Sequence, residues 1–534
     1  MAHGLTAGAG RWASLWAPVL AGTLGAGAAI ATGELLAGLV RGAPSLVNEV
    51  GTLVIALQPP GAKDFVVALF GTNDKLALNV LVVALALLLA GGVGVLAARN
   101  FTLGAAAFVA AGALALFAAV RDPLVSQGHA LLVAVLAVSA GLAVLAGLLS
   151  LVPGTSVAGA FGGQAQPGAP GTAGDDDAAW TRRRFLIASA GTIGVVVAAG
   201  GAGRWLLQDE HGEGIVSTSR LPAAFIAVPP LATDQTIDRV GITPLVVPND
   251  QFYRIDTALL VPQVDVASWQ LEVKGMVDHP LTFTYDQLLA MPLYEQYVTI
   301  ACVSNKVGDH LVGNALWTGV RLKEVLAQAG VQAGATQIVG RSVDGFTVGF
   351  PTSWALDPQR EPLIAVGMAR EPLPAAHGFP ARLIVPGLFG YVSATKWLAS
   401  IELTTREAVD GYWIPLGWAK DGPILTQSRI DLPVNGDDVA AGPYEVAGVA
   451  WAPDRGITKV ELKVDDGDWQ AARISRPISK ATWVQWAFDW TATPGRHSLE
   501  VRATDGTGTV QTDEQTDPAP DGARGHHRIS VNVS

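Results

Sequence analysis

The chain has 534 residues, of which half are hydrophobic and 15% are charged, and its formal net charge is -11. This length exceeds that of one ordinary domain, and the acidic balance argues against nucleic-acid binding, which requires basic patches. A single cysteine excludes an intrachain disulfide framework, CxxC zinc sites, cysteine-ligated iron–sulfur clusters and the CxxCH haem attachment motif.

Residues 1–152 carry little charge and contain apolar runs long enough to cross a bilayer. A spanning helix needs about 20 mostly apolar residues, and four runs meet this need: 16–40, 76–97, 101–120 and 130–152. Residues 44–71 are apolar but broken by QPPGAKD, so they form a kinked span, a re-entrant segment or a surface segment. His3 and His129 lie near segment ends, which argues against a haem held by paired histidines. We expect residues 1–152 to form a multi-span α-helical membrane bundle.

A linker and one more apolar run follow the bundle. Residues 153–183 are rich in Gly, Pro, Ala and Asp and are expected to be flexible. Residues 184–207 are then expected to form an additional transmembrane helix, which begins at the last of the three arginines in TRRRFL. Arginines that flank a span tend to stay in the cytoplasm, so we expect the chain from residue 208 onward to be extracytoplasmic. TRRRFL also resembles a twin-arginine export signal, although a simple positive-inside anchor explains it equally well.

Residues 208–427 mix short strand-like and helical runs after a proline-rich lead-in. WQLEVKG (269–275) alternates like a strand, whereas VRLKEVLAQAG (320–330) is helical with a glycine stop. This mixture predicts an α+β domain. Residues 428–534 consist of strand-like runs separated by Gly, Asp and Pro turns, at a spacing and total length typical of an all-β sandwich.

Cys302, the only cysteine, lies in TIACVSNKVGDHL. A lone cysteine is usually a small buried apolar group. However, SNKVGD is too polar and glycine-rich for a core strand, and an exposed thiol outside the cytoplasm oxidises unless it is occupied. The residues alone leave two other roles open: a nucleophile, with His310 or His377 as its base, or a ligand to a thiophilic metal.

Five motifs between about residues 240 and 400 occur in the order NDQFYRID, CVSNKVG, WTGVRL, LPAAHGFPARLIVPG and YVSATKWL. With the β segments that follow, they resemble the sulfite oxidase family of molybdenum enzymes, in its bacterial membrane-anchored type. The resemblance covers more than half of the chain. It implies a sulfite-oxidase-type domain with molybdopterin as the cofactor. It also implies a C-terminal immunoglobulin-like domain of a kind that often makes homodimers.

The same resemblance assigns site residues position by position. Cys302 matches the cysteine that binds molybdenum, and Arg254 is the second catalytic candidate because it lies near the substrate entrance. The positions that match cofactor-binding residues are Asn249, Phe252, Tyr253, Arg254, Asp344, His377, Arg382, Ser393 and Lys396. Arginine and lysine suit this task because they supply charge-assisted donors to a phosphate. Each residue taken singly has an ordinary structural explanation, and their order together with Cys302 favours cofactor contact.

The sequence departs from the family pattern around the substrate. Lys306 and Val307 replace an arginine pair of the plant and animal sulfite oxidases, and Ile255 replaces an arginine of their entrance loop. Trp418 stands in place of a pocket tyrosine. A pocket for a small dianion needs a cationic clamp, and only Arg254 remains for that role. Sulfite oxidation and the reduction of an S-oxide or N-oxide therefore both stay open.

The sequence thus predicts a membrane-anchored, molybdopterin-dependent oxidoreductase that performs oxo transfer on the extracytoplasmic side of the cytoplasmic membrane. Its expected partners are a small-molecule substrate, membrane lipid, and an electron carrier that is either a quinone or a separate redox protein. The alternative is a membrane-anchored binding or adhesion protein with a degenerate molybdenum domain. Replacement of Cys302, Arg382 or Lys396 would favour that alternative, and all three are present.

Overall fold

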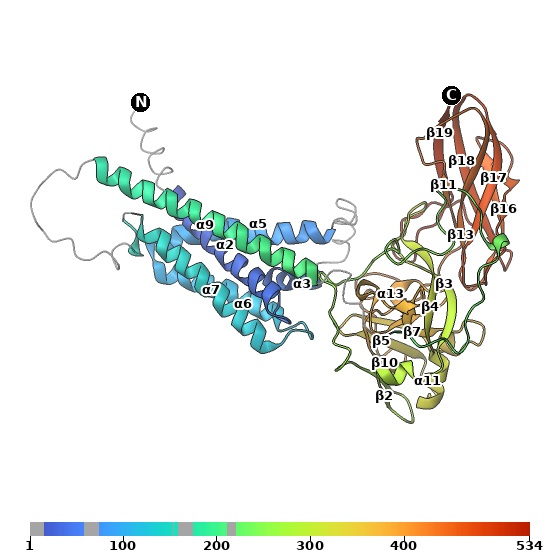
Figure 1. Ribbon diagram of the computed structural model, residues 1–534, viewed down its shortest axis with the longest axis horizontal. Coiled ribbons are helices and arrows are strands. Elements are labelled where there is room, and N and C mark those ends of the chain that lie inside the picture. The colour runs from blue at the N-terminus through green and yellow to red at the C-terminus, as the bar shows by residue number, and fades with distance from the viewer. Residues whose placement is uncertain (1–14, 58–73, 153, 158–174, 211–219) are drawn as a thin grey trace, which may run out of the picture. The chain divides into compact units, whose positions relative to one another are not determined.

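The computed structural model describes residues 15–57, 74–152, 154–157, 175–210 and 220–534. The chain divides into two compact units, which are shown in Figure 1. The first comprises Met1–Gly212 with Ala258–Val261, and the second comprises Glu213–Thr257 with Pro262–Ser534. The first unit is built of helices, and the second is built mainly of strands.

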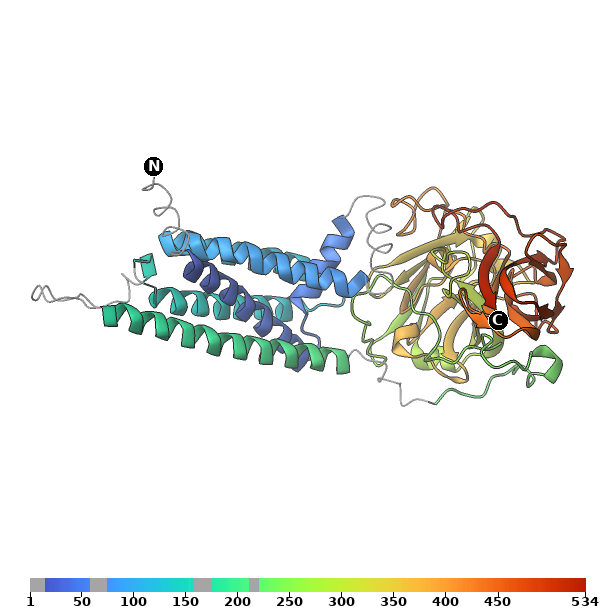
Figure 2. The same cartoon turned by 90° about the horizontal axis from the view of Figure 1, so that it is seen from above.

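Within the described residues, five helices of the first unit are long and apolar enough to cross a membrane. They are α2 (Trp16–Leu39), α5 (Asp74–Arg99), α6 (Phe101–Ala119), α7 (Gln127–Ser150) and α9 (Asp175–Glu210). The helix α2 packs against α5, α7 and α9, and the helices lie side by side in both views of the unit (Figure 1, Figure 2). The apolar helices expected from the sequence are therefore present.

The backbones of these helices approach closely where glycines meet. A Cβ atom on Gly22 of α2 would lie 2.1 Å from the carbonyl oxygen of Ala90 on α5. A Cβ atom on Gly203 of α9 would lie 2.5 Å from the carbonyl carbon and oxygen of Glu34 on α2. Small residues permit this approach, and close packing is what associates helices in lipid, where the hydrophobic effect does not act between them.

The start of α9 differs from the sequence-based expectation, and part of the ambiguous segment 44–71 is now described. The helix α9 begins at Asp175, so residues 175–183 of the linker expected over 153–183 are helical. Residues 158–174 of that expected linker lie outside the described residues. In the ambiguous segment 44–71, α3 (Leu46–Leu57) is a short apolar helix, and the rest of the segment is likewise outside the described residues.

The second unit opens with an α+β domain that contains two sheets, as the sequence predicts. One sheet has the order β2-β1-β10-β5-β6, and the other has the order β3-β4-β7-β8 with β9 paired to β7. Only β1 and β10 pair in parallel within these sheets. The strands are β1 (Gln270–Gly275), β2 (Leu281–Thr284), β3 (Tyr294–Ala301), β4 (Val312–Arg321), β5 (Gln337–Ser342), β6 (Thr347–Pro351), β7 (Leu363–Met368), β8 (Glu371–Pro372), β9 (Arg382–Ile384) and β10 (Leu398–Thr404).

Short helices connect these strands, and local sequence signals account for their ends. Thr284 and Gln287 form a reciprocal capping box at the start of α10 (Tyr285–Leu289). The helix α11 (Leu322–Ala329) ends at Gly330, whose φ of 68° is favourable for glycine. The remaining elements are η2 (Thr233–Gln235), α12 (Thr352–Leu356), η3 (Ala375–His377) and α13 (Gly390–Ser393).

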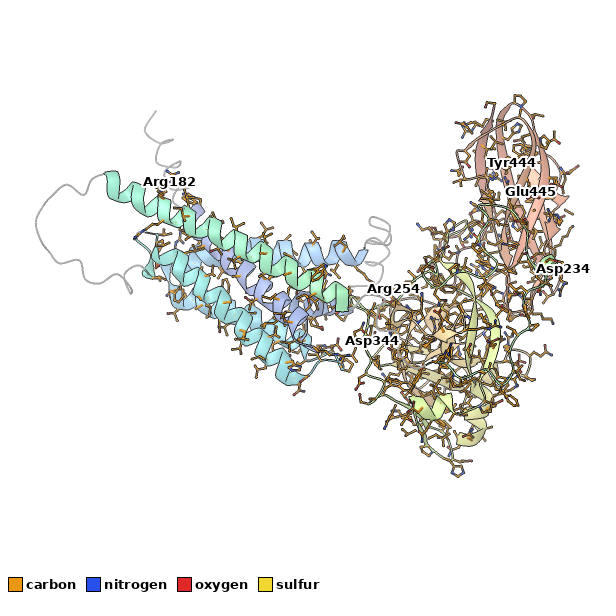
Figure 3. The ribbon with its side chains drawn as sticks, in the orientation of Figure 1. Arg182, Asp234, Arg254, Asp344, Tyr444 and Glu445 are labelled. Carbon is orange, nitrogen blue, oxygen red and sulfur yellow. The ribbon has the colours of Figure 1, made fainter. Side chains whose placement is uncertain are left out.

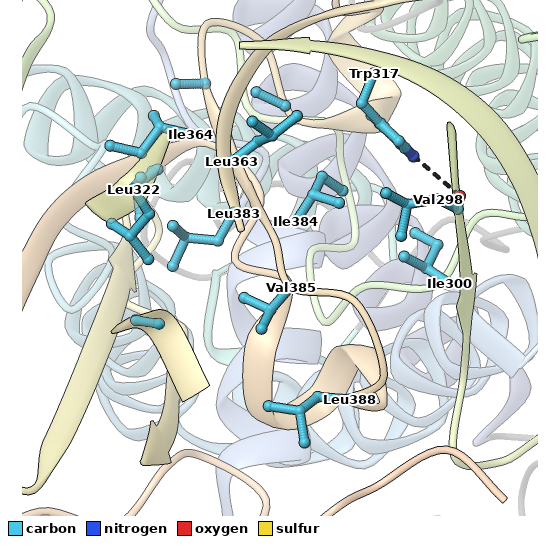
Figure 4. Close-up of a cluster of buried hydrophobic side chains, with 14 of the residues drawn as sticks. Val298, Ile300, Trp317, Leu322, Leu363, Ile364, Leu383, Ile384, Val385 and Leu388 are labelled. Carbon is cyan, nitrogen blue, oxygen red and sulfur yellow. Dashed lines mark hydrogen bonds between the residues drawn. The ribbon is translucent and has the colours of Figure 1, made fainter. Parts of the chain in front are cut away.

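The core of the α+β domain lies between these sheets and helices, and Figure 4 shows its centre. Trp317 on β4 is fully buried, and its indole nitrogen donates to the carbonyl oxygen of Val298 on β3 at 3.2 Å. Leu363 on β7 and Ile384 on β9 pack into the same cluster. Every residue of β7 is buried, as expected for a strand that is covered on both faces. This packing fixes the strand ends from which the site residues extend.

The last part of the chain is an all-β sandwich, which confirms the sequence-based prediction. One sheet has the order β11-β13-β17-β16 and the other has the order β12-β19-β18-β14-β15. Val446 and Trp486 from the first sheet meet Val460 and Val501 from the second in a shared core. The strands are β11 (Gln427–Leu432), β12 (Asp438–Val439), β13 (Gly442–Trp451), β14 (Ile457–Val464), β15 (Gln470–Ala471), β16 (Arg473–Ile474), β17 (Val484–Ala492), β18 (Gly495–Asp505) and β19 (His527–Val533).

Candidate active site

Cys302 begins the loop that joins β3 to β4, which we call the Cys302 loop (residues 302–311). The Cys302 amide donates to the carbonyl oxygen of Leu311 at 2.9 Å, and the Asn305 amide donates to the carbonyl oxygen of Cys302 at 3.1 Å. The Asn305 side chain accepts from the Leu311 amide at 2.7 Å. The asparagine of the C-x-x-N motif therefore closes the loop, and the partly buried thiol is held at the end of a core strand.

Tyr253 lies near Cys302, and Arg382 lies near Tyr253. Burial and the nearby thiol raise the pKa of Tyr253 above its usual value, although Arg382 opposes this shift. The phenol therefore stays protonated at neutral pH and can donate a hydrogen bond. Arg382 is 3% exposed, and its guanidinium carbon lies 5.0 Å from the centre of the Trp317 ring. Burial lowers the pKa of Arg382 to about 10, so the guanidinium remains charged at neutral pH.

His377, at the end of η3, is neutral at physiological pH. Burial lowers its pKa to about 4, and the nearby Lys396 and Arg382 contribute to this shift. Its Nε2 lies 3.0 Å from the carbonyl oxygen of Asn249, which can only accept, so Nε2 carries the proton. Phe252 packs edge-on against the imidazole with ring centroids 5.7 Å apart. This geometry leaves Nδ1 as an acceptor with a fixed orientation.

Lys396 and Arg254 share one carboxylate. Nζ of Lys396 donates to Asp256 at 2.9 Å, and Nε of Arg254 donates to the same oxygen at 2.9 Å. The Asp256 and Lys396 side chains are 5% and 9% exposed, whereas the Arg254 side chain is 37% exposed. Burial lowers the pKa of Lys396 to about 8, and Asp256 opposes the shift. Arg254 therefore lies at the solvent edge of the group, and Lys396 lies in its interior.

Asp344 and Ser393 have more local roles. Asp344 accepts from the Phe346 amide at 3.1 Å in the turn between β5 and β6, and the adjacent Val343 amide donates to the carbonyl oxygen of Trp397. This bond ties the Asp344 turn to the segment that carries Lys396. The Ser393 hydroxyl is buried and lies 3.0 Å from the carbonyl oxygen of Phe389, the residue that precedes α13. Its hydrogen bonds therefore fix the start of α13 rather than reach the other site residues.

The structure thus brings most of the expected residues into one group. Cys302 and Arg382 both affect the pKa of Tyr253, and Arg382 also lowers the pKa values of His377 and Lys396. Asn249 and Phe252 join the group through His377. Figure 3 shows Arg254 and Asp344 well away from Tyr444 and Glu445 of the sandwich, so this group belongs to the α+β domain.

Three buried polar atoms of the group have no hydrogen-bond partner among the described residues. They are Oδ1 of Asn249, Nδ1 of His377 and Nε of Arg382. An unpaired buried polar atom destabilises the fold, so such atoms cluster where a ligand pairs with them. Arg254, Arg382 and Lys396 also outnumber the single carboxylate of Asp256, which leaves an excess of two positive charges. The group therefore fits a ligand that combines an anion with a polar heterocycle.

Asp256 is a site residue that the sequence-based analysis missed. It lies two residues after Arg254 in the same motif. A carboxylate so close to a cation that is expected to face the substrate was the signal that could have revealed it. Trp317, which lies under Arg382, was missed as well, because a tryptophan on a core strand has no local mark of a cation–π contact.

Comparison with known families gives an independent identification of both domains. Residues 258–413 match the oxidoreductase molybdopterin binding domain, and residues 427–501 match the bacterial Ig domain. The first match contains Cys302, Asp344, His377, Arg382 and Lys396. Molybdopterin, a pterin that carries a phosphate, is the kind of ligand that the unpaired atoms and the charge excess fit.

Individual proteins agree with the family match. Mitochondrial sulfite oxidase from Homo sapiens is 29% identical over 315 residues, which cover 50% of this chain and 57% of the human protein. Nitrate reductase [NADH] 1 from Oryza sativa subsp. japonica is 27% identical over 319 residues, covering 48% of this chain and 34% of that protein. The match therefore spans little more than half of the length of the sulfite oxidase relative.

A solved structure is also similar to this chain. The sulfane dehydrogenase SoxCD from Paracoccus pantotrophus is 23% identical, with a TM-score of 0.47, and the match covers 55% of this chain and 84% of that one. The chain therefore contains a molybdopterin-binding oxidoreductase domain that is similar to those of the sulfite oxidases and nitrate reductases.

Proposed function

We propose that the protein is a membrane-anchored enzyme that transfers an oxygen atom to or from a small molecule at a molybdenum centre bound by Cys302. The observation that carries this proposal is the charge excess of a group that Tyr253 links to Cys302, combined with atoms on Asn249, His377 and Arg382 that have no partner among the described residues. When bound, the cofactor supplies the two-electron oxo-transfer chemistry. The protein supplies a soft thiolate, a fixed orientation and an electrostatic environment.

Each residue of the group then has a distinct task. Arg382 and Lys396 would hold the phosphate of the cofactor, because both supply charge-assisted donors. The unprotonated Nδ1 of His377 and Oδ1 of Asn249 would supply acceptors to the bound cofactor. The phenol of Tyr253 is a donor close enough to Cys302 for the thiol to raise its pKa. Phe252 keeps the imidazole of His377 in place.

The substrate enters at Arg254, the most exposed cation of the group. Two reactions suit this site: oxidation of sulfite, and reduction of an S-oxide or N-oxide. Sulfite is an anion and would use Arg254 directly, whereas a neutral oxide would need only a hydrogen-bond donor. A dye-coupled assay distinguishes them, because sulfite reduces an oxidised dye and an S-oxide or N-oxide oxidises a reduced one. The electron carrier in the cell is a quinone or a separate redox protein.

The proposed orientation puts the second unit outside the cytoplasmic membrane. Arg182, Arg183 and Arg184 precede the apolar part of α9, and arginines beside a span tend to stay in the cytoplasm. Arg41 follows α2 and lies near the opposite end of α9, where Arg204 pairs with Glu34. We base the proposed orientation on the three arginines at the start of α9, because they outnumber Arg41. Protease added to spheroplasts should digest the second unit. Digestion only in inverted vesicles would contradict this orientation.

The central test is the metal content of the purified full-length protein. We expect about one molybdenum atom per chain, as one thiolate ligand implies, together with the fluorescence of extracted oxidised pterin. Cys302→Ala should reduce dye-linked activity by more than about 100-fold, since loss of a metal ligand exceeds the effect of losing an outer partner. Arg473→Ala, in an exposed ion pair on the sandwich, is the control. Well-folded protein without metal and pterin, from cells supplied with molybdate, would refute the proposal.

A further inference from the structure

The sandwich contacts the Cys302 loop through a buried arginine. Arg429 on β11 is 1% exposed, and its Nη1 donates to the carbonyl oxygen of Asp309 in the Cys302 loop at 2.8 Å. Its other nitrogens are occupied as well: Nε pairs with Asp431 at 2.6 Å, and Nη2 donates to the Thr243 hydroxyl at 2.7 Å. A fully buried guanidinium with three directed bonds is a rigid contact.

A second strand of the sandwich touches the far end of the same loop. The ring of His527 at the start of β19 lies against Gly308, and a Cβ atom on Gly308 would be 2.4 Å from that ring. Nδ1 of His527 accepts from the Ile430 amide at 3.0 Å, which holds the ring in place. Gly308 has a φ of 83°, so glycine is required there for both the backbone conformation and the close approach.

A third contact fixes the strand that leads into Cys302. The Thr299 amide on β3 donates to the carbonyl oxygen of Ala481 at 2.9 Å, and the Thr299 hydroxyl accepts from the Trp483 amide at 2.8 Å. Trp483, which directly precedes β17, is fully buried in the core of the α+β domain, not in that of the sandwich. Its indole donates to the carbonyl oxygen of Leu245 at 2.7 Å.

From these three contacts we infer that the sandwich positions Cys302, with Arg429 and His527 as positioning residues. The contacts come from both sheets of the sandwich and hold the approach to Cys302 and the far end of its loop. The sandwich is thus a part of the active-site support and not only an appended module. This inference rests on the proposed role of Cys302 as the molybdenum ligand. Its test, however, needs no metal.

The test measures how readily the thiol is exposed in the metal-free full-length chain. Because Cys302 is the only cysteine, the rate of alkylation by N-ethylmaleimide reports on this one loop. Arg429→Lys keeps a charge near Asp431 but lacks the fork that reaches Asp309, and His527→Ala removes the ring from Gly308. We expect both variants to be labelled on the order of tenfold faster, because the loop opens locally more often.

Two matched variants control for general effects on the sandwich. Arg473→Lys alters an arginine in an exposed ion pair with Glu445, and His497→Ala removes a histidine bonded to Asp465, both without contact to the Cys302 loop. Each should be labelled at the wild-type rate. The faster labelling should depend only weakly on urea, since local opening exposes little surface, whereas global unfolding gives a steep dependence.

Unchanged labelling of Arg429→Lys and His527→Ala would overturn the inference. Equal acceleration in the controls, or a steep dependence on urea, would overturn it too, because either result means that the variants only destabilise the fold. The molybdenum content of the wild-type protein tests the proposed function separately. A chain without metal whose loop nevertheless opens in these variants would keep the positioning role and refute the enzymatic one.

Discussion

Two buried polar clusters, one in the helical bundle and one in the α+β domain, differ in their balance of charge. In the bundle, Arg204 of α9 pairs with Glu34 of α2 at 2.8 Å, and Ser45 donates to the same carboxylate at 2.6 Å. In the α+β domain, three cations face the single carboxylate of Asp256. The first cluster is neutral within itself, whereas the second keeps an excess of two positive charges. Buried charges need partners, so the excess in the second cluster favours the binding of an anion there.

The two clusters also differ in what they connect. The bundle cluster joins four helices, because Asn48 of α3 accepts from Asn79 of α5 at 3.0 Å and contacts Arg204. Polar residues in such a position hold helices together. The α+β cluster instead gathers residues from loops and strand ends around a core that is already packed. The same residue types therefore occur in two settings, and the local charge balance distinguishes the cluster that is paired within itself from the one that we propose binds a ligand.

Removal of one excess cation should give the largest change in free energy, as weaker binding of the cofactor. Arg382→Met should weaken cofactor binding by about 2–5 kcal/mol, the range for deleting one partner of a buried charged contact. The metal-free chain should be destabilised less, because Arg382 is desolvated and its Nε has no partner among the described residues, although Nη1 donates to the carbonyl oxygen of His377 at 3.0 Å. Molybdenum content after gel filtration and melting of the metal-free chain measure the two effects. Full metal content in the variant would show that the excess charge does not serve the cofactor.

The excess charge should also appear as a dependence of stability on pH. Burial, Lys396 and Arg382 lower the pKa of His377 to about 4 from its usual 6.5. As the pH falls from about 6.5 to about 4, the unfolded chain binds a proton at His377 and the folded chain does not, so the folded state loses stability. The loss should be on the order of 3 kcal/mol at most. His377→Gln should remove this part of the acid sensitivity of the metal-free chain, and identical melting profiles from pH 7 to 4 would contradict it.

A smaller effect should follow from removing the one carboxylate. Asp256→Asn raises the excess from two positive charges to three, so competitive inhibition by sulfate should strengthen roughly tenfold, or by about 1.4 kcal/mol. The Michaelis constant for a neutral oxide substrate should change little, and added salt should reduce the difference. Asp466→Asn, at an exposed turn of the sandwich, is the control. Equal changes for sulfate and a neutral substrate would mean that Asp256 only orders the loop.

The smallest effect is expected in the balanced cluster. Glu34→Gln should destabilise the bundle by about 1 kcal/mol, the usual size of polar contacts between helices in lipid, and should leave the molybdenum content unchanged. Arg204→Gln combined with Glu34→Gln should cost less than the sum of the single changes, because the pair acts together. Thermal unfolding in detergent measures this coupling. Loss of molybdenum in Glu34→Gln would remove the distinction between the two clusters.

Much of the architecture could be predicted from the sequence because its signals are local. The apolar runs predict the helices α2, α5, α6 and α7 to within a few residues, since the length of an apolar run by itself indicates a helix that can cross a bilayer. The start of α9 at Asp175 could not be predicted, because a charged, alanine-rich segment has no apolar pattern to separate helix from linker. The alternation of WQLEVKG likewise predicts β1, whose burial alternates in its first residues.

The candidate site divides in the same way. The sequence by itself determined which functional groups are present: one thiol at Cys302, and cations and a histidine in motifs of a recognisable order. Only the tertiary structure decided how these groups pair. It gave Lys396 and Arg254 a shared carboxylate in Asp256, left Nε of Arg382 without a partner, and placed Arg429 of the sandwich on the Cys302 loop. Pairing and burial depend on distances between residues far apart in the chain, and local sequence patterns do not encode those distances.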